Sequence, residues 1–422
     1  MRSIRVGAAL AVGGTLLLVT ACGGGSTSSK TVGAGAPAAG ASAGAGGASA
    51  GASAGASAGS SGSSGATPAS AAVVDIEPKD GTQNAAPDAL KVDVSSGKLS
   101  QVTVTDKSGQ TVQGSISADG TSWVPATGLS VADSYQVKAQ ATDAKGVTTT
   151  ATSSFSTLTP AKTSRSQDNV VTGSTYGVGM IVSFNFGMPI QNKQAVDNAI
   201  TFETSDGTQV KGHWMGNNRL DIRPQNFWNP NTQVKVHIRL KNVEVSPGVY
   251  GGSDRDESFT ISNRAQISTV DAAAHTMTVQ DNGQTIETIP ISSGSDEHPT
   301  YNGTMVIEDK EGTTRMTSAS VPGLAPGEYD LMVPHAMRLT DSGTYVHGNN
   351  WSSAGTFGTA NVSHGCVGLQ DAPGNAGGTD TPAAKFYAAS LVGDVVKVVN
   401  SKGAQVTPDN GLSGWNMPWS TW

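Results

Sequence analysis

The chain has 422 residues, with 26 Lys and Arg, 33 Asp and Glu, and only 2 cysteines. This length exceeds what one hydrophobic core usually holds, so several domains are expected. A formal net charge of −7, with Lys and Arg scattered along the sequence, argues against a nucleic-acid partner. No glycine-rich phosphate loop follows a predicted strand, so no cofactor is expected.

Residues 1–21 read as a secretory signal. Two arginines precede an apolar run over residues 6–19, which is too short to span a bilayer stably. The small residues directly before Cys22 resemble the lipobox of bacterial lipoproteins, which implies cleavage there and a lipid on the Cys22 sulfur. We therefore expect a lipid-anchored protein on the outer, extracytoplasmic face of the cell membrane. The alternative is an ordinary signal peptide with an incidental cysteine.

Residues 22–72 comprise the lipidated Cys22 and a predicted linker. They are almost entirely Gly, Ala and Ser, with Ala-Ser-Ala-Gly repeats between residues 41 and 59. Such a composition cannot bury a core, so disorder is expected. A flexible coil of this kind would act as a tether with an end-to-end distance on the order of 40 Å.

Two β-sandwiches are predicted after the linker, over residues 73–158 and 159–263. Apolar residues alternate with polar ones in short runs that are separated by turn signals such as Asp119-Gly120. This pattern is typical of small immunoglobulin-like sandwiches. The second sandwich is also expected to hold one short helix near residues 192–200. The sequence leaves two roles open for these sandwiches, as spacers or as modules that bind the cell wall.

Residues 264–400 are predicted to form a third, mostly β domain with one main helix. Asn282-Gly283 is a strong hairpin signal, because both residues of that turn take positive φ. Pro382 opens the predicted helix, and residues 395–399 form a closing strand. The tail, residues 401–422, holds three tryptophans, which we expect to pack on the folded part rather than face solvent.

The third domain contains the most informative stretch, Ser363-His364-Gly365-Cys366, preceded by His347-Gly348. A thiol becomes a nucleophile when a base takes its proton, and a nearby imidazole can do so near neutral pH. Backbone N–H groups can then stabilise the oxyanion formed on the attacked carbonyl. These residues therefore predict acyl transfer through Cys366.

The same residues carry a family resemblance. The third domain resembles the YkuD-type L,D-transpeptidase domain, and the whole chain resembles actinobacterial lipoproteins in which two Ig-like domains precede it. The family motif appears here as His347-Gly348 and then Ser363 to Cys366, with Cys366 lying 19 positions (366 − 347) after His347. Residues 290–294 and 299–304 match the opening of that domain, and residues 386–387 and 393–400 match its end.

The resemblance implies a reaction on peptidoglycan. Cys366 would attack the carbonyl after the third residue of a donor tetrapeptide stem and release D-Ala. The thioester would then pass to the side-chain amine of diaminopimelate on an acceptor stem, giving a 3→3 cross-link. Carbapenem β-lactams are the implied inhibitors, because their carbonyl mimics the donor amide and would acylate Cys366.

The resemblance also implies roles for single residues. His347 would be the base and proton shuttle, oriented through the backbone carbonyl of Gly348. The N–H groups of Gly365 and Cys366 would form the oxyanion hole. The residues implied in substrate binding are Tyr329, Met316, Ser363, His364 and Trp351. For His364 and Ser363, hydrogen bonds that hold the loop are an equally good interpretation.

One position departs from the family pattern. The family usually has Asn two residues after the cysteine, and this chain has Gly368, which puts local substrate contacts in doubt. A non-catalytic or carboxypeptidase-like envelope lipoprotein that binds the wall through its Ig-like domains is therefore the alternative function.

Three other classes fit less well. A zinc site formed by His347, His364 and Cys366 lacks an obvious fourth ligand, so no metal is expected. In papain-like and NlpC-type peptidases the cysteine precedes the histidine, and here both histidines come first. A sortase needs an arginine after its cysteine, and no Lys or Arg occurs between Cys366 and Lys385.

Overall fold

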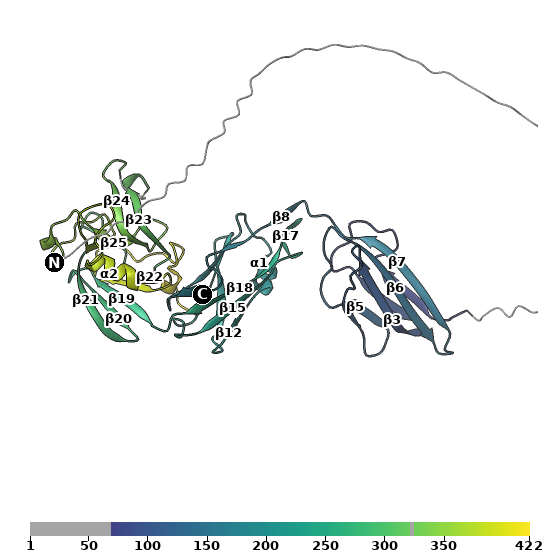
Figure 1. Cartoon of the computed structure of the whole chain (residues 1–422). Coiled ribbons are helices and arrows are strands. Elements are labelled where there is room, and N and C mark those ends of the chain that lie inside the picture. Colours follow the sequence, from purple (N-terminus) through teal and green to yellow (C-terminus); the bar gives the residue numbers. More distant parts are fainter. Residues whose placement is uncertain (1–68, 321–324) are drawn as a thin grey trace, which may run out of the picture. The chain divides into compact units, whose positions relative to one another are not determined.

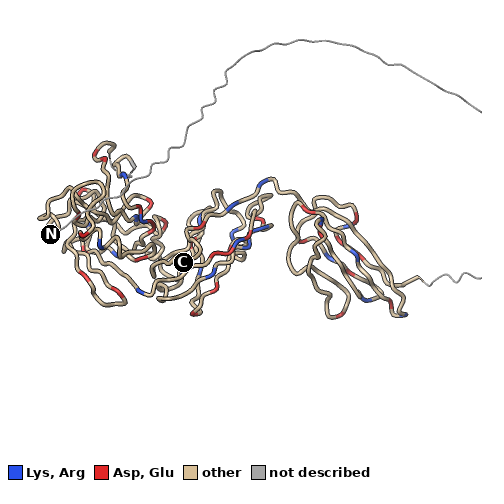
Figure 2. The backbone as a smooth tube through the Cα atoms, in the orientation of Figure 1, with Lys and Arg blue, Asp and Glu red and all other residues tan. Residues whose placement is uncertain are grey.

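The computed structural model describes residues 69–320 and 325–422. The predicted signal peptide, Cys22 and nearly all of the predicted linker lie outside these residues. The described chain is mainly β, which confirms the predicted fold class. Within the described residues, no helix has the length and apolar character needed to cross a membrane. Figure 2 shows Lys and Arg interspersed with Asp and Glu along the chain.

The first domain is a sandwich of two antiparallel sheets, with strand orders β1-β2-β5-β4 and β3-β6-β7 (Figure 1). Alternating burial along β6 turns Tyr135, Val137 and Ala139 into the core. Ala72, the residue before β1, is also buried in this core. The strands are β1 (Val73–Glu77), β2 (Lys91–Ser95), β3 (Gly97–Asp106), β4 (Gly114–Ile116), β5 (Ser122–Pro125), β6 (Ser134–Asp143) and β7 (Thr148–Ser156).

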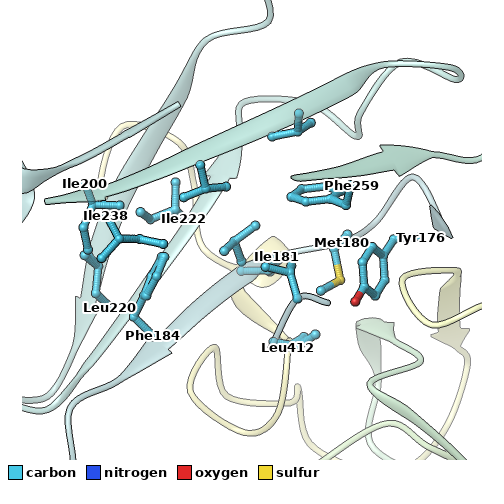
Figure 3. Packing of buried hydrophobic residues seen from close by; sticks show 14 of the residues in the cluster. Tyr176, Met180, Ile181, Phe184, Ile200, Leu220, Ile222, Ile238, Phe259 and Leu412 are labelled. Carbon is cyan, nitrogen blue, oxygen red and sulfur yellow. The ribbon is translucent and has the colours of Figure 1, made fainter. Parts of the chain in front are cut away.

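The second domain has two four-stranded sheets, β10-β18-β15-β12 and β13-β14-β11-β9, and a small third sheet, β16-β17-β8. Its core lies between the sheets (Figure 3). The short helix α1 (Lys193–Ala199) begins after Asn192, whose side chain caps it. The strands are β8 (Lys162–Ser164), β9 (Gln167–Asp168), β10 (Thr175–Tyr176), β11 (Val182–Asn185), β12 (Ile200–Thr204), β13 (Val210–Met215), β14 (Arg219–Pro224), β15 (Gln233–Arg239), β16 (Glu244–Ser246), β17 (Val249–Gly251) and β18 (Asp254–Ile261).

The third domain is built on one nine-stranded mixed sheet, in the order β22-β27-β19-β20-β21-β26-β25-β24-β23. At the predicted hairpin, Asn282 and Gly283 have φ of 48° and 79° between β20 and β21. The elements are β19 (Gln266–Asp271), β20 (Thr276–Asp281), β21 (Gln284–Ser292), β22 (Gly303–Val306), β23 (Asp309–Thr317), η1 (Ser318–Ser320), β24 (Asp330–Arg338), β25 (Tyr345–Asn349), η2 (Ala354–Thr356), β26 (Val367–Gln370), α2 (Pro382–Ala389) and β27 (Val395–Val399).

The helix α2 packs against β24, β25 and β26. It begins at Pro382, and the Thr381 hydroxyl accepts a hydrogen bond from the Ala384 N–H. Proline suits this position, because the first N–H groups of a helix have no partner within it. The buried residues Ala383, Ala384 and Phe386 fix the helix against the strands that carry the candidate catalytic residues.

The C-terminal tail lies against the second domain and includes η3 (Gly414–Asn416). The indole N–H groups of Trp415 and Trp422 donate to the backbone carbonyls of Gly179 and Lys211, each at 2.8 Å. The Arg223 guanidinium lies 4.2 Å from the Trp422 ring centroid and 4.6 Å from that of Trp415. Leu412 joins the core of the second domain (Figure 3).

Candidate active site

Three neighbouring strands carry the catalytic motif to the middle of the large sheet. β26 pairs in parallel with β25 on one side and antiparallel with β21 on the other. In the parallel register His347 lies opposite Gly368, and Val346 lies opposite Val367, the residue after Cys366. The sheet therefore brings the histidine and the cysteine, which are distant in sequence, to the same place.

The ring of His347 is buried, with 4% of the residue exposed, and two contacts hold it. Its Nδ1 lies 3.1 Å from the backbone carbonyl oxygen of Gly348, and the indole of Trp351 stacks on its face at 5.6 Å between centroids. A carbonyl can only accept a hydrogen bond, so we assign the proton to Nδ1. Nε2 is then left as a proton acceptor.

The electrostatics of the site favour a neutral imidazole and a neutral thiol. Burial lowers the pKa of His347 from its ordinary value of 6.5, although the Gly348 carbonyl and the Asp371 charge act in the opposite direction. Burial raises the pKa of Cys366 to about 11, against a lowering by the Tyr345 backbone. The Cys366 sulfur lies 3.6 Å from the Gly343 carbonyl oxygen. The thiol therefore gives up its proton only when a base takes it.

Ser363 holds the loop that presents the cysteine. Its hydroxyl donates to the Cys366 carbonyl at 2.6 Å and accepts from the Gly365 N–H at 3.1 Å. The backbone of Ser363 is itself bonded to Ser293 and Ser295. Gly365 has φ of 115°, a conformation that favours glycine. The structure thus gives Ser363 a positioning role within this loop.

This loop changes the expected oxyanion hole. The Gly365 N–H already donates to Ser363, and Gly348 contributes its carbonyl oxygen to the orientation of His347. Neither glycine lines the pocket that contains Cys366. Of the three backbone positions predicted from the sequence, the Cys366 N–H therefore remains the candidate oxyanion donor.

A pocket of about 370 Å³ contains both His347 and Cys366. It also gathers the predicted substrate residues Met316, Tyr329, Trp351, Ser363 and His364. Sequence reasoning missed its other lining residues, which are Glu328, Leu331, Val333, Asn349 and Val362. Two-residue periodicity was the available signal for several of them, because successive residues of a strand that share a face lie two positions apart.

Tyr329 and His364 form one side of the pocket. Their rings are 5.1 Å apart between centroids, and His364 Nε2 lies 3.5 Å from a Glu328 carboxylate oxygen. Burial, followed by the charge of Cys366, raises the pKa of Tyr329 to about 12. Tyr329 is therefore a neutral phenol at physiological pH and can donate a hydrogen bond to a bound substrate.

Asn349 occupies the space beside Gly368. A Cβ at Gly368 would lie 3.2 Å from the Asn349 Cβ and 3.3 Å from its Nδ2. The Asn349 side chain donates to the Ser352 hydroxyl and accepts from the backbone N–H groups of Ser352 and Trp351. The Asn349 side chain, which comes from the adjacent parallel strand β25, therefore lies against Gly368, the position that departs from the family pattern.

Gly348 also has a structural reason to be glycine. A Cβ there would lie 2.1 Å from an Asp371 carboxylate oxygen. Burial raises the pKa of Asp371, but hydrogen bonds from Gly378, His335 and Thr381 outweigh it and hold the pKa below its ordinary value. A carboxylate therefore lies directly against the strand that carries His347.

Comparisons with known proteins agree with this architecture. A family profile described as the YkuD L,D-transpeptidase catalytic domain matches residues 265–398, and one described as a bacterial Ig domain matches residues 82–244. L,D-transpeptidase 2 of Mycobacterium tuberculosis is 31% identical over 346 residues, which cover 81% of this chain and 82% of that protein. L,D-transpeptidase 5 of the same species is 26% identical over 84% of this chain and 77% of its own length.

Solved structures of similar sequence include an LD transpeptidase in complex with imipenem, with a TM-score of 0.46 and 31% identity. It covers 57% of this chain and 100% of its own length. The predicted order, an Ig-like region followed by a YkuD-type domain, is confirmed by the two family profiles. The similarity to L,D-transpeptidase 2, which covers 81% of this chain, extends into both parts. This chain therefore belongs to the L,D-transpeptidase family.

Proposed function

We propose that this chain forms 3→3 cross-links in peptidoglycan through a thioester on Cys366, with release of D-Ala. The observation that carries the proposal is the placement of His347 and Cys366 in one pocket, with the Gly348 carbonyl holding the imidazole. A buried neutral imidazole is suited to take a thiol proton as the sulfur attacks.

The proposed first half-reaction follows from these protonation states. The Cys366 sulfur bonds to the carbonyl carbon that links the third residue of the donor stem to the fourth. The proton of the thiol moves to His347 Nε2. The Cys366 N–H stabilises the oxyanion. When the C–N bond breaks, His347 returns the proton to the departing D-Ala amine. A thioester and neutral His347 remain.

The second half-reaction repeats the proton transfer with the acceptor. The neutral side-chain amine of diaminopimelate attacks the thioester carbonyl and passes a proton to His347. Collapse of the intermediate breaks the C–S bond, and the proton returns to the Cys366 sulfur. The products are the cross-linked stems and the free thiol.

Mass spectrometry of a reaction with a disaccharide-tetrapeptide tests the proposal. The full chain should give a cross-linked dimer that has lost one D-Ala, and Cys366→Ala should give none. Cys22→Ala is the matched control, because it removes the only other cysteine and should leave the product unchanged. Free tripeptide alone would indicate a carboxypeptidase, and no turnover by folded protein would favour the non-catalytic alternative.

We also propose that Cys22 carries a lipid that holds the protein on the outer face of the cell membrane. The support is the small-residue run that ends at Cys22 and the short apolar segment before it. Cys22→Ala should move the protein from the membrane fraction to the soluble fraction. Retention of the variant in the membrane fraction would contradict the lipid anchor.

A further inference from the structure

Three side chains from separate loops meet beside the catalytic pocket. His298 comes from the connection between β21 and β22, Glu328 from the segment before β24, and His364 from the loop before Cys366. One ligand atom from each lies within 4.8 Å of the other two. Within residues 69–320 and 325–422, no other three His, Cys, Asp or Glu side chains bring their ligand atoms this close together.

The geometry of the group is close to that of a metal site. In a tetrahedral zinc site with bonds of about 2.0–2.1 Å, neighbouring ligand atoms are about 3.3 Å apart. His364 Nε2 and a Glu328 carboxylate oxygen already lie 3.5 Å apart. The His298 ring stacks on that of His364 at 5.1 Å between centroids. The three-ligand arrangement would be complete once the other ligand atoms, now within 4.8 Å of one another, approached to that spacing.

The chemistry of the donors also suits a cation. Two imidazoles and one carboxylate are the set that a divalent transition metal such as zinc prefers, and they leave one position open. No hydrogen bond to either ring nitrogen of His298 occurs among the described residues. This set excludes His347 and Cys366, so it differs from the His347, His364 and Cys366 set, for which the sequence offers no obvious fourth ligand.

We propose that His298, Glu328 and His364 bind a divalent transition-metal cation of the zinc class at the rim of the active site. Glu328 and His364 are exposed and line the pocket, whereas His298 lies outside it. A cation at this position would lie beside Glu328 and His364, two residues of the pocket wall, and would narrow access to Cys366. Its binding slows acylation of Cys366. This inhibitory part rests on the proposed function, whereas the binding site does not.

Calorimetric titration of the full chain with Zn²⁺ tests the site directly. The parent is the Cys22→Ala, Cys366→Ala variant, which contains no thiol that could bind the metal. We expect one ion per chain, with affinity lowered at least tenfold by His298→Ala and by Glu328→Gln. Affinity that is unchanged in both variants, or no binding by the parent, would overturn the proposal.

His237→Ala is the matched control. His237 lies in the second domain and contacts two carboxylates, those of Glu203 and Asp256. Non-specific binding to a histidine beside carboxylates would therefore be reduced by this change as well. We expect the affinity for Zn²⁺ to stay the same. A loss equal to that of His298→Ala would show that the binding is not specific to the rim.

Acylation kinetics then test inhibition in protein that keeps Cys366. With a carbapenem as the reagent, Zn²⁺ should slow adduct formation at least fivefold in Cys22→Ala, and EDTA should restore it. Adding His298→Ala should remove the effect. Equal inhibition with and without His298 would place the inhibitory metal on the thiol and contradict this role. Because binding is measured without Cys366, failure of the transpeptidase proposal would leave that result intact.

Discussion

The side chain of Asn349 fills the space beside Gly368 and holds the backbone that carries Trp351. It reaches across from β25 to the residue opposite His347 in β26. Its carbonyl oxygen accepts from the Trp351 N–H, and Trp351 stacks on His347. Asn349 therefore links the position that departs from the family pattern to the orientation of the catalytic base.

Replacing Asn349 with Ala is expected to lower both stability and rate. The change leaves two partly buried backbone N–H groups without their acceptor, and since a fully buried unsatisfied group costs about 1–3 kcal/mol, a loss near the lower end of that range is expected. Chemical denaturation and the rate of carbapenem acylation check the two effects. Asn350→Ala is the control, because the side chain of this half-buried neighbour makes, among the described residues, a single hydrogen bond, to the Gly374 carbonyl. Equal effects of the two changes would contradict a special role for Asn349.

Restoring the family residue as Gly368→Asn is expected to destabilise the protein on its own. Its Cβ would lie 3.2 Å from that of Asn349, and overpacking of this kind costs roughly 1–3 kcal/mol. Asn349→Gly has its own cost but should relieve this strain, so the double variant should lose less stability than the sum of the two single losses. Denaturation of the four proteins in a double-mutant cycle measures the coupling. Additive effects would show that the two positions are independent.

The pH dependence of acylation should be flat through neutrality. Burial holds the pKa of His347 below 6.5, so the imidazole loses its capacity as a base only as the pH falls through that lower value. Burial raises the pKa of Cys366 to about 11, so little free thiolate forms below pH 9. Second-order rates of carbapenem acylation from pH 5 to 9 measure the profile. A tenfold rise per pH unit up to pH 9 would instead indicate reaction through thiolate formed by solvent.

The sequence predicted the mainly β fold and pointed to His347 and Cys366, because strand periodicity and the chemistry of an imidazole and a thiol can be recognised without knowing which strands are neighbours. Alternating apolar residues mark strands, and the two ends of the motif carry the chemistry. It did not predict that the Gly365 N–H is used by Ser363, or that Asn349 lies against Gly368. The first contact is local, but a serine hydroxyl can bond several nearby backbone groups, and the sequence does not say which one. The second depends on which strands become neighbours, and a parallel pairing leaves no short-range turn signal.

The sequence also did not group His298, Glu328 and His364, because their proximity depends on the fold. His298 and His364 lie 66 positions apart (364 − 298), and neither has the close paired spacing that marks a metal site in sequence. The antiparallel pairing of β21 with β26 brings the loops that carry His298 and His364 to the same end of the sheet. In the strand register the end of β24, not its beginning, is level with the start of β26, so the sheet order alone does not place Glu328 beside them.

Truncating Trp422 is expected to destabilise the region where the tail meets the second domain. This residue is 2% exposed, donates to the Lys211 carbonyl and packs against Arg223. Trp→Ala in a packed site costs about 3–5 kcal/mol, which should lower the melting midpoint by several degrees. Calorimetry should show an unchanged transition for the first domain, because that domain has a separate core.

Trp351→Ala is the matched control for the tail variant. Trp351 is 48% exposed, so removing it creates little cavity and should leave the melting midpoint nearly unchanged. It stacks on His347, however, so its loss should slow carbapenem acylation, whereas Trp422→Ala should retain the acylation rate at temperatures where the protein is folded. The two variants should therefore differ in opposite ways, with Trp422→Ala lowering the melting midpoint and Trp351→Ala lowering the acylation rate. A tail variant that melts normally but acylates slowly would contradict the structural role of Trp422.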